Sequence, residues 1–278
     1  MTWKFITAGV GSRNFEAAAD RLAESIAEFK IFDHIQTYKT SDVLRYAPEI
    51  TKWYSINELD QIKGYGWYVW KSRFALQAIS EGFGDGDGIM YLDAGCEAFI
   101  SSFSKRRLRH YMKIAEETGA CLFKIPTPER NYTKRMVVNR FVDVKLIDEF
   151  QFQSGSWLFT GALAKEFIAK WDAIVWEDQR FTDESISPGG EIDGFICNRY
   201  DQAIFSMLAR AHSLDYCGDI PPGDISRKKP MLRLFVYPFA WARNRSGQSK
   251  VPSLMRISGN ISVTLSVLLE KLRGKLTN

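Results

Sequence analysis

A strand–helix–strand pattern opens the chain, and it constrains the fold more than any other feature of the sequence. The β-rich run 3–10 is followed by apolar residues at near-helical spacing over 15–29, and then by a second candidate strand, 30–38. A strand that crosses over through a helix to the next strand builds a parallel sheet covered by helices. The opening therefore predicts an α/β fold with a mostly parallel sheet flanked by helices.

The later segments continue the alternation of strands and helices. We expect strands over 89–92, 120–125 and 150–160, and helices over 104–118, 162–176 and 203–211. Ser104 is the expected N-cap of its helix, and Pro126 is expected to end the strand before it. The acidic, glycine-rich segment 182–194 is a candidate lid over a site. With 278 residues, the chain is long enough for a substantial core.

The stretch from Gly64 to Glu97 carries the best candidate site. An aromatic and glycine cluster at 64–70 leads into Lys71 and a helical pattern, and the short apolar strand 89–92 then stops at Asp93. In open α/β sheets, ligands bind beyond the carboxyl ends of the strands. The pattern is typical of a site for a metal and a phosphorylated ligand, although a buried strand that ends in an ordinary polar turn fits the same residues.

The residue types of this stretch suggest individual roles. Asp93 is the best metal-ligand candidate, because Mg²⁺ and Mn²⁺ prefer carboxylate oxygen. Glu97 could join it only if the chain stays extended past Gly95. A leaving diphosphate needs positive charge, and stacking on a base or a sugar needs aromatic rings. The candidates for these two roles are Lys71, Arg73, Arg130 and Lys134 for charge, and Trp67, Tyr68 and Trp70 for stacking.

Several other classes of protein are disfavoured. The sequence has no nucleophile elbow, zinc-protease motif or Walker A loop, and its three histidines form no evident triad. It has no apolar run long enough to span a membrane. The four cysteines have no metal-ligand spacing, which favours a reduced, cytoplasmic protein.

The charge is unevenly distributed. The net charge is +4, yet residues 226–278 alone carry +10, so residues 1–225 carry −6. We therefore expect two parts, a body over 1–225 and a basic extension over 226–278. Leucines and isoleucines between 261 and 276 fall on one helical face, which suits an amphipathic helix at a membrane surface or one that packs on the body. A solvated basic tail is the simpler alternative.

Five motifs in order resemble those of bacterial GT-A-fold glycosyltransferases of polysaccharide and lipopolysaccharide biosynthesis. They lie at 64–71, 91–97, 132–134, 153–159 and 199–202, and the resemblance covers roughly residues 3–217. It implies a GT-A-like (Rossmann-like) domain over 1–225 that binds a nucleotide sugar. The implied activity is transfer of a hexose, with a UDP-sugar favoured, to a glycan or lipid-linked glycan acceptor in bacterial surface polysaccharide synthesis. Nucleic acid is not an expected partner.

The resemblance also implies roles for particular residues. It places Mn²⁺ or Mg²⁺ on Asp93, with Glu97 as a further ligand, and sugar or acceptor contacts at Gln153, Ser154, Gly155 and Gln202. Asp201 becomes an active-site acid, although an aspartate there can equally cap a helix. The sequence departs from the Asp-x-Asp metal motif, because Gly95 stands where the second Asp would be. A retaining reaction is favoured, and an inverting one with Asp201 or Asp193 as base remains open.

Two other functions compete with this one. A nucleotidyltransferase-like enzyme would need a glycine-rich basic loop near the N-terminus, and residues 9–13 supply a poor version. A non-catalytic protein that binds a membrane or a polyanion would explain the basic extension but not Asp93. The expected location is the cytoplasm, with contact to the inner face of the cytoplasmic membrane through the extension.

Overall fold

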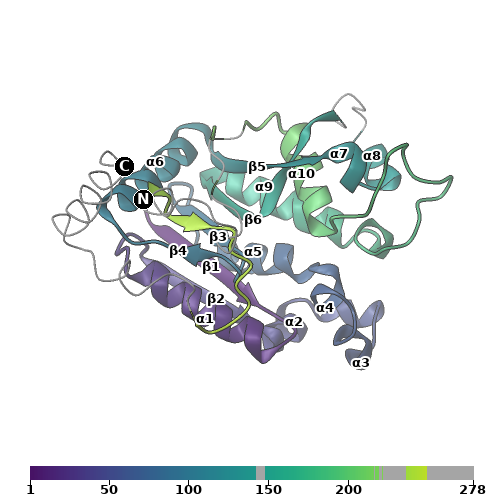
Figure 1. Ribbon diagram of the computed structural model, residues 1–278, viewed down its shortest axis with the longest axis horizontal. Coiled ribbons are helices and arrows are strands. Elements are labelled where there is room, and N and C mark those ends of the chain that lie inside the picture. The colour runs from purple at the N-terminus through teal and green to yellow at the C-terminus, as the bar shows by residue number, and fades with distance from the viewer. Residues whose placement is uncertain (142–147, 216, 219–220, 222–235, 249–278) are drawn as a thin grey trace, which may run out of the picture.

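The computed structural model describes residues 1–141, 148–215, 217–218, 221 and 236–248, and they form a mixed sheet between two layers of helices (Figure 1). The sheet has the order β2-β1-β3-β6-β5. β1, β2 and β3 are parallel, whereas β6 runs antiparallel to both β3 and β5. The strands are β1 (Trp3–Gly9), β2 (His34–Lys39), β3 (Gly88–Leu92), β5 (Ala120–Pro128) and β6 (Phe150–Thr160).

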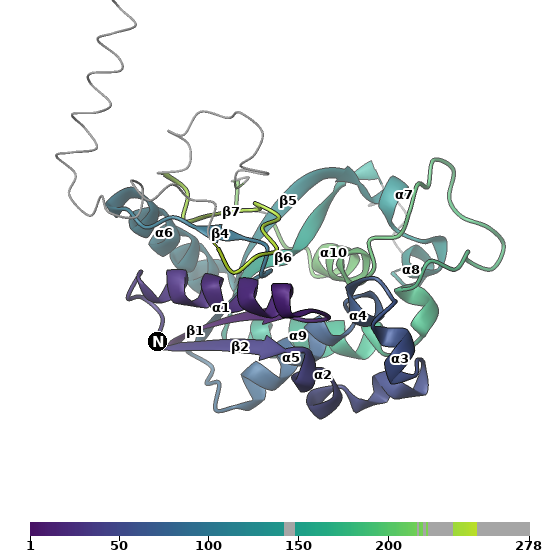
Figure 2. The same ribbon diagram turned by 60° about the horizontal axis from the view of Figure 1, so that its bottom comes forward.

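Helices cover both faces of this sheet. The helices are α1 (Arg13–Ala27), α2 (Thr40–Tyr46), α3 (Ile56–Leu59), α4 (Gly64–Trp67), α5 (Trp70–Ser80), α6 (Ser102–Thr118), α7 (Glu129–Tyr132), α8 (Arg135–Arg140), α9 (Gly161–Val175) and α10 (Asp201–Ala211), with 3₁₀ turns η1 (Pro48–Lys52) and η3 (Gln179–Phe181). α1 and α6 pack on one face, and α5, α9 and α10 on the other (Figure 2). The expected fold class, an α/β fold with a mostly parallel sheet flanked by helices, is confirmed.

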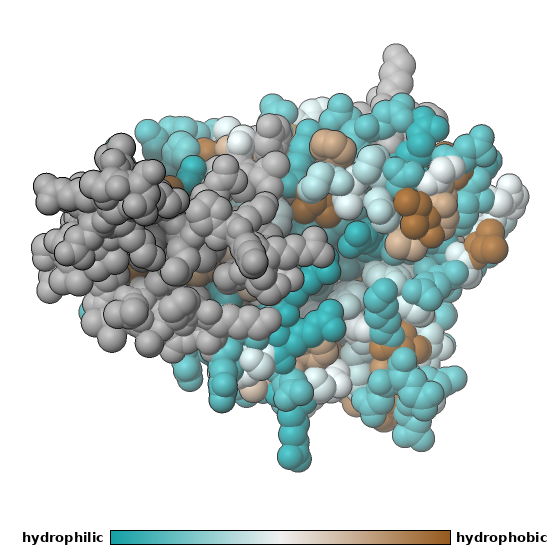
Figure 3. All heavy atoms as spheres, viewed as in Figure 1, coloured by the Kyte–Doolittle hydropathy of each residue, from teal (hydrophilic) through white to brown (hydrophobic). Residues whose placement is uncertain are grey.

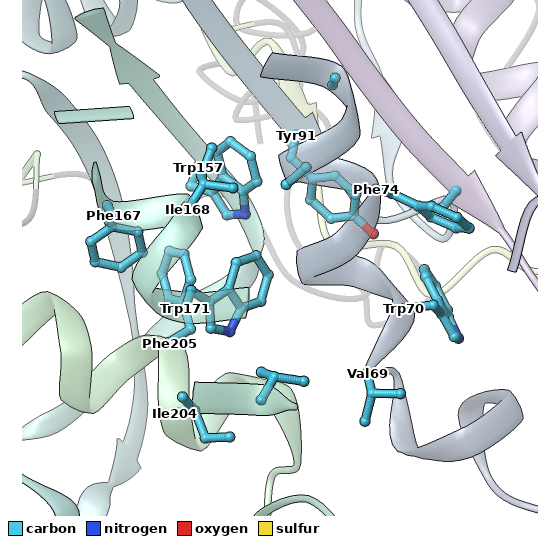
Figure 4. Close-up of a cluster of buried hydrophobic side chains, with 14 of the residues drawn as sticks. Val69, Trp70, Phe74, Tyr91, Trp157, Phe167, Ile168, Trp171, Ile204 and Phe205 are labelled. Carbon is cyan, nitrogen blue, oxygen red and sulfur yellow. The ribbon is translucent and has the colours of Figure 1, made fainter. Parts of the chain in front are cut away.

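Alternation along the strands explains the two layers, because successive side chains of a strand point to opposite faces. On β3, Met90 and Leu92 pack towards α1 and α6, whereas Ile89 and Tyr91 pack towards α5 and α9. The second of these clusters is aromatic. Figure 4 shows Tyr91, Trp157, Trp171 and Phe205 converging between strands and helices, with Trp157 and Trp171 fully buried. Half of the eight tryptophans are buried core residues.

Two local expectations differ from the structure. The N-cap of α6 is Ser101, whose hydroxyl accepts a hydrogen bond from the Ser104 amide at 3.0 Å, so Ser104 occupies the third helical position of a capping box. β5 does not end before Pro126 but continues to Pro128. It can do so because β5 is the edge strand, where proline is tolerated, and its pairing with β6 is irregular between Lys124 and Pro128.

A second, small sheet joins part of the basic extension to the body. β4 (Glu97–Ala98) pairs antiparallel with β7 (Phe239–Ala240), and Phe239 is buried. Residues 236–248 thus pack against the body. The boundary expected at 225/226 and the amphipathic helix expected between 261 and 276 lie outside the described residues. Among the described helices, none combines the length and apolar character needed to cross a bilayer.

Candidate active site

The site is built at the carboxyl edge of the parallel strands. β3 ends at Leu92 and delivers Asp93 into a turn. The antiparallel strand β6 enters the sheet at this same edge, because Ser156 pairs with Leu92. Its residues Ser154 and Gly155 therefore lie beside Asp93, whose amide donates to the Gly155 carbonyl at 2.8 Å. Two segments that are distant in sequence are brought to one point by strand register alone.

A buried lysine occupies the centre of the site. Lys71 lies in the first turn of α5, and its side chain is only 4 % exposed. Its Nζ lies 3.1 Å from Asp93 Oδ1 and 3.2 Å from Asp201 Oδ2, and the rings of Tyr68 and Tyr91 lie 5.6 Å away. A buried charge is tolerated when it is paired and hydrogen-bonded. The lysine thus holds two carboxylates from distant parts of the chain together.

The two carboxylates differ in their access to solvent. The Asp93 side chain is 44 % exposed, whereas that of Asp201 is 5 % exposed. Tyr91 donates its hydroxyl hydrogen to Asp93 Oδ1 at 2.8 Å, and Ser154 donates to Asp201 Oδ2 at 2.8 Å. Asp93 is therefore the carboxylate that a ligand from solvent can reach, whereas Asp201 is buried.

Burial and charge set the protonation of this group. Burial raises the pKa of Asp201, and Lys71 and Ser154 oppose that shift. Burial alone would lower the pKa of Lys71, but Asp201 and Asp93 outweigh it and raise the pKa. Opposite charges at about 3 Å stabilise one another strongly where water is excluded. We conclude that Lys71 remains a cation between the two aspartates.

Strained backbone surrounds the site. Tyr65, Trp67 and Tyr68 have φ values of 51°, 61° and 64°, and Tyr200, directly before Asp201, has φ 54°. Such values are uncommon for residues other than glycine, and each costs on the order of 1–3 kcal/mol. The rings of Trp67 and Tyr200 stack at 5.1 Å. The strained residues therefore include two tyrosines next to the site, Tyr68 beside Lys71 and Tyr200 directly before Asp201.

A glycine is required next to Asp93. A Cβ at Gly155 would lie 2.2 Å from Asp93 Oδ2, far inside contact distance. The same Cβ would lie 3.1 Å from the amide nitrogen of Gln153. The structure therefore brings Lys71, Asp93, Ser154, Gly155 and Asp201 together as a group, with Gln153 and Trp67 at its edge.

Several residues predicted for the site are engaged elsewhere. Trp70 is 4 % exposed, donates to the Gly64 carbonyl and packs on Phe74. Gln202 is buried, and its amide donates to Gln151 at 2.8 Å, within a network that includes Glu129. Neither side chain has the access to solvent that ligand contact requires.

The expected phosphate ligands Arg130 and Lys134 are also paired with protein groups. Lys134 is fully buried and donates to the Arg180 carbonyl, to Asp183 and to Ser185. Arg130 makes two hydrogen bonds to the exposed Asp148. Arg73, also considered for phosphate, pairs with Asp172 and Glu49. These cations hold the 180–185 segment, Asp148 and the α5–α9 contact in place.

Asp193 is exposed in the segment 182–194, the candidate lid. That segment is anchored to Asn131 of α7, whose side chain donates to the Gly194 carbonyl. Glu184 of the same segment accepts from the Tyr200 hydroxyl at 2.7 Å, and Lys63 donates to that hydroxyl at 2.6 Å. In the described part of the chain, no hydrogen bond or ion pair joins Asp193 to Lys71, Asp93 or Asp201.

The Asp93 and Glu97 pair does not fit a divalent metal. The chain turns after Asp93, whose carbonyl accepts from the Cys96 amide at 2.9 Å. Glu97 then points into the protein, where it is 1 % exposed and pairs with Arg21 at 2.7 Å. Within the ranges that the structure describes, no three His, Cys, Asp or Glu side chains are grouped to hold a metal ion. The extended chain that a shared ligand role requires is replaced by a turn.

Two tyrosines at the candidate site, Tyr91 and Tyr200, were not predicted from the sequence. Tyr91 lies two residues before Asp93, so strand alternation could have placed its hydroxyl on the same face. Tyr200 directly precedes Asp201, but nothing in the local sequence signals its strained backbone.

A surface pocket at Thr2, His34 and Gly88 lies at the amino ends of the strands, away from the carboxylates. All four cysteines are free.

Comparisons with known proteins add little. No family model matches the chain, and no curated protein does. Among solved structures, the chain is similar to the apo crystal structure of mouse xyloside xylosyltransferase 1. The identity is 12 %, the match covers 86 % of this chain and 97 % of that chain, and the TM-score is 0.40. A likeness at this level assigns no activity to the chain, whose function has to be inferred from its own side chains.

Proposed function

We propose that this chain is a glycosyltransferase that moves a hexose from a nucleoside-diphosphate sugar, preferably a UDP-sugar, to a glycan or lipid-linked glycan acceptor. One observation supports it above all others. Lys71 holds the exposed Asp93 and the buried Asp201 together at the carboxyl edge of the sheet. The strand order reverses at β1, which has β2 on one side and β3 on the other. In α/β sheets, ligands bind at such a switch point, beyond the carboxyl ends of the strands.

The chemistry requires a positioned donor sugar. The bond between the anomeric carbon and the phosphate oxygen breaks, and the nucleoside diphosphate leaves with the bonding electrons. An acceptor hydroxyl oxygen bonds to that carbon, and its proton passes to the departing diphosphate. Asp93 is the group that contacts the sugar in this proposal, because its Oδ2 accepts no hydrogen bond from the described residues and its side chain is exposed. Fixed charges around a reacting sugar need no reorganisation during the reaction.

Asp201 is a positioning residue in the proposal. Asp201 is buried, and its Oδ2 accepts a hydrogen bond from the Ser154 hydroxyl and pairs with Lys71 Nζ. It therefore acts on the sugar through Lys71 and Asp93. The stacked pair of Trp67 and Tyr200 stands at the edge of the group. Aromatic faces of this kind suit stacking on a sugar or a base. The stereochemical outcome is left to experiment, with retention as our proposal.

The acceptor and the location of the protein are further parts of the proposal. A bacterial surface polysaccharide acceptor follows from the motif resemblance, and membrane contact from the basic extension. Anionic membranes attract Lys and Arg near their surface. A chain lacking residues 252–278 should lose binding to anionic liposomes, and sedimentation of unchanged amounts with the liposomes would remove membrane contact from the proposal.

Nucleotide binding tests the function itself. We would measure the midpoint of thermal unfolding with UDP, GDP, CDP and dTDP. A ligand at 100 times its Kd adds about 2.7 kcal/mol to the stability of the folded state. For a chain of this size we expect a rise of about 5 °C with one diphosphate. If no nucleotide moves the midpoint, a non-catalytic binding protein becomes the better interpretation.

A further inference from the structure

Residues 236–248, here called the C-terminal strap, cross the turn that carries Asp93. After β7, the Trp241 indole donates to Ser156 Oγ at 3.0 Å, and the Asn244 amide donates to the Gly95 carbonyl at 2.9 Å. The Cα of Arg243 lies 3.5 Å from where a Cβ on Gly95 would stand. Figure 1 shows the yellow segment after β7 running from β4 towards α1. The strap is therefore a neighbour of the site, although it is distant in sequence.

Buried polar contacts fix the strap in this position. Arg21 of α1 pairs with Glu97 and donates to the carbonyls of Ala94, Cys96 and Asn244 at 2.9, 3.1 and 3.4 Å. The side chain of Asn244, itself 1 % exposed, also donates to Glu97. Buried charges tolerate little displacement, because each lost hydrogen bond leaves an unpaired polar group. Strap, turn and α1 are therefore joined by one buried network of hydrogen bonds and an ion pair.

Two arginines of the strap are exposed beside the site. Arg243 has a left-handed backbone with φ 50°, and Arg245 lies over the ring of Phe15 at 5.4 Å. Phe15 lies in the first turn of α1, so the Arg245 guanidinium lies at the start of that helix. Neither arginine forms an ion pair with a carboxylate of the described residues. Their charge is available to a ligand.

The cations that the sequence suggested for a diphosphate are paired with protein groups. Lys71 is occupied by two aspartates, and Lys134 and Arg130 are paired elsewhere. Asp93 and Glu97 do not form a metal site. A leaving diphosphate nevertheless develops negative charge that must be stabilised. Arg245, over Phe15 at the start of α1, and Arg243, beside the turn that carries Asp93, are placed to supply it.

We propose that Arg245, assisted by Arg243, binds the diphosphate of the donor nucleotide through charge-assisted hydrogen bonds. Arginine suits this role, because its planar fork of N–H donors matches phosphate oxygens in a bidentate manner. The inference rests on the proposed function and makes it more specific: the basic strap completes the donor site. It predicts that diphosphate binding does not require a divalent metal.

Calorimetric titration of the four nucleoside diphosphates in EDTA tests this proposal. For the diphosphate that binds the wild-type protein, Arg245→Ala should raise the Kd by about tenfold or more, consistent with loss of a charged hydrogen bond. The Kd of Arg245→Lys, which keeps the charge but loses the planar fork of donors, should lie between the Kd of the wild type and that of Arg245→Ala. Arg109→Ala, an exposed arginine on α6, is the matched control and should bind as wild type does. The corresponding nucleoside, which lacks phosphate, should bind the Arg245 variants and wild type equally.

The outcomes separate the two proposals. If wild type binds a diphosphate and Arg245→Ala binds it equally well, the strap proposal is overturned and the glycosyltransferase proposal stands. If wild-type binding disappears in EDTA and returns with Mn²⁺, the metal supplies the charge and the strap proposal is again overturned. If wild type binds no diphosphate under any condition, both are overturned. Circular dichroism spectra should confirm that each variant is folded.

Discussion

Lys71 is the residue on which the site depends most, because it is a buried cation shared by two aspartates. The sequence suggested that Lys71 binds phosphate, and the structure places its Nζ between Asp93 and Asp201. Its partner could not be predicted, because Asp201 is distant in sequence and reaches it only through the packing of α10 on β6. Local patterns reveal residue types at a strand end, but not which charges are paired across the core.

Replacing Lys71 with methionine should destabilise the protein. The change leaves Asp93 and Asp201 without their shared counter-ion, and breaking a buried pair costs about 3–5 kcal/mol. Adding Asp201→Asn should restore part of this loss, because the unpaired buried charge is removed. Lys165→Met is the control, since Lys165 pairs with Asp85 on the surface and exposed pairs contribute about 0–1 kcal/mol. Urea unfolding measures all four proteins, and equal stability of the two single variants would contradict this role.

The pH dependence of activity reports on Asp201. Its pKa is raised by burial, while the hydrogen bond from Ser154 opposes the rise. The ionised carboxylate should therefore be lost, and activity with it, as pH falls through a value above the ordinary aspartate pKa of about 3.9. Ser154→Ala removes the opposing hydrogen bond, so the acid limb of kcat/KM should move to higher pH. A shift to lower pH, or none, would show that Asp201 does not govern this limb.

At the scale of elements, the sequence predicted most of the strands and helices but not their directions. Residues 89–92 and 150–160 were expected as strands, and both are present. Strand direction was not signalled, because pairing depends on contacts between residues far apart in the chain. β6 is antiparallel, and this reversal brings Ser154 and Gly155 to Asp93. Glu97 was misplaced for a related reason: its partner, Arg21, lies on α1.

A substitution in β6 next to Asp93 should reduce activity while the protein remains folded. Gly155→Ala places a methyl group where Asp93 Oδ2 lies, so the carboxylate must move. Activity should fall at least about tenfold, since misplacement by about 1 Å is costly to catalysis. Gly86→Ala is the control, because no atom lies within 4 Å of its added Cβ. Steady-state kinetics and thermal midpoints compare the two, and normal turnover in Gly155→Ala would contradict the role of Asp93.

At the scale of the whole molecule, the strap from the basic extension packs on one body, formed by residues 1–141 and 148–215. Composition correctly marked the change in charge, but it could not show that residues 239–240 pair with residues 97–98. Among the residues coloured in Figure 3, the hydrophobic side chains on this face lie in separate patches. The exposed carboxylate of Asp93 lies next to β6, to Lys71 of α5 and to the turn that the strap crosses.

Turnover of nucleotide sugars tests the central claim most directly. Purified protein should be incubated with a panel of UDP-, GDP-, CDP- and dTDP-sugars and mixed glycan acceptors, and released nucleoside diphosphate measured. We expect the wild-type protein to consume one donor. Asp93→Asn should consume the same donor at a rate lower by a factor of about 100 or more, and its thermal midpoint should be close to that of the wild type. Equal turnover by Asp93→Asn, or no consumption of any donor by wild type, would contradict a glycosyltransferase built on Asp93 and Lys71.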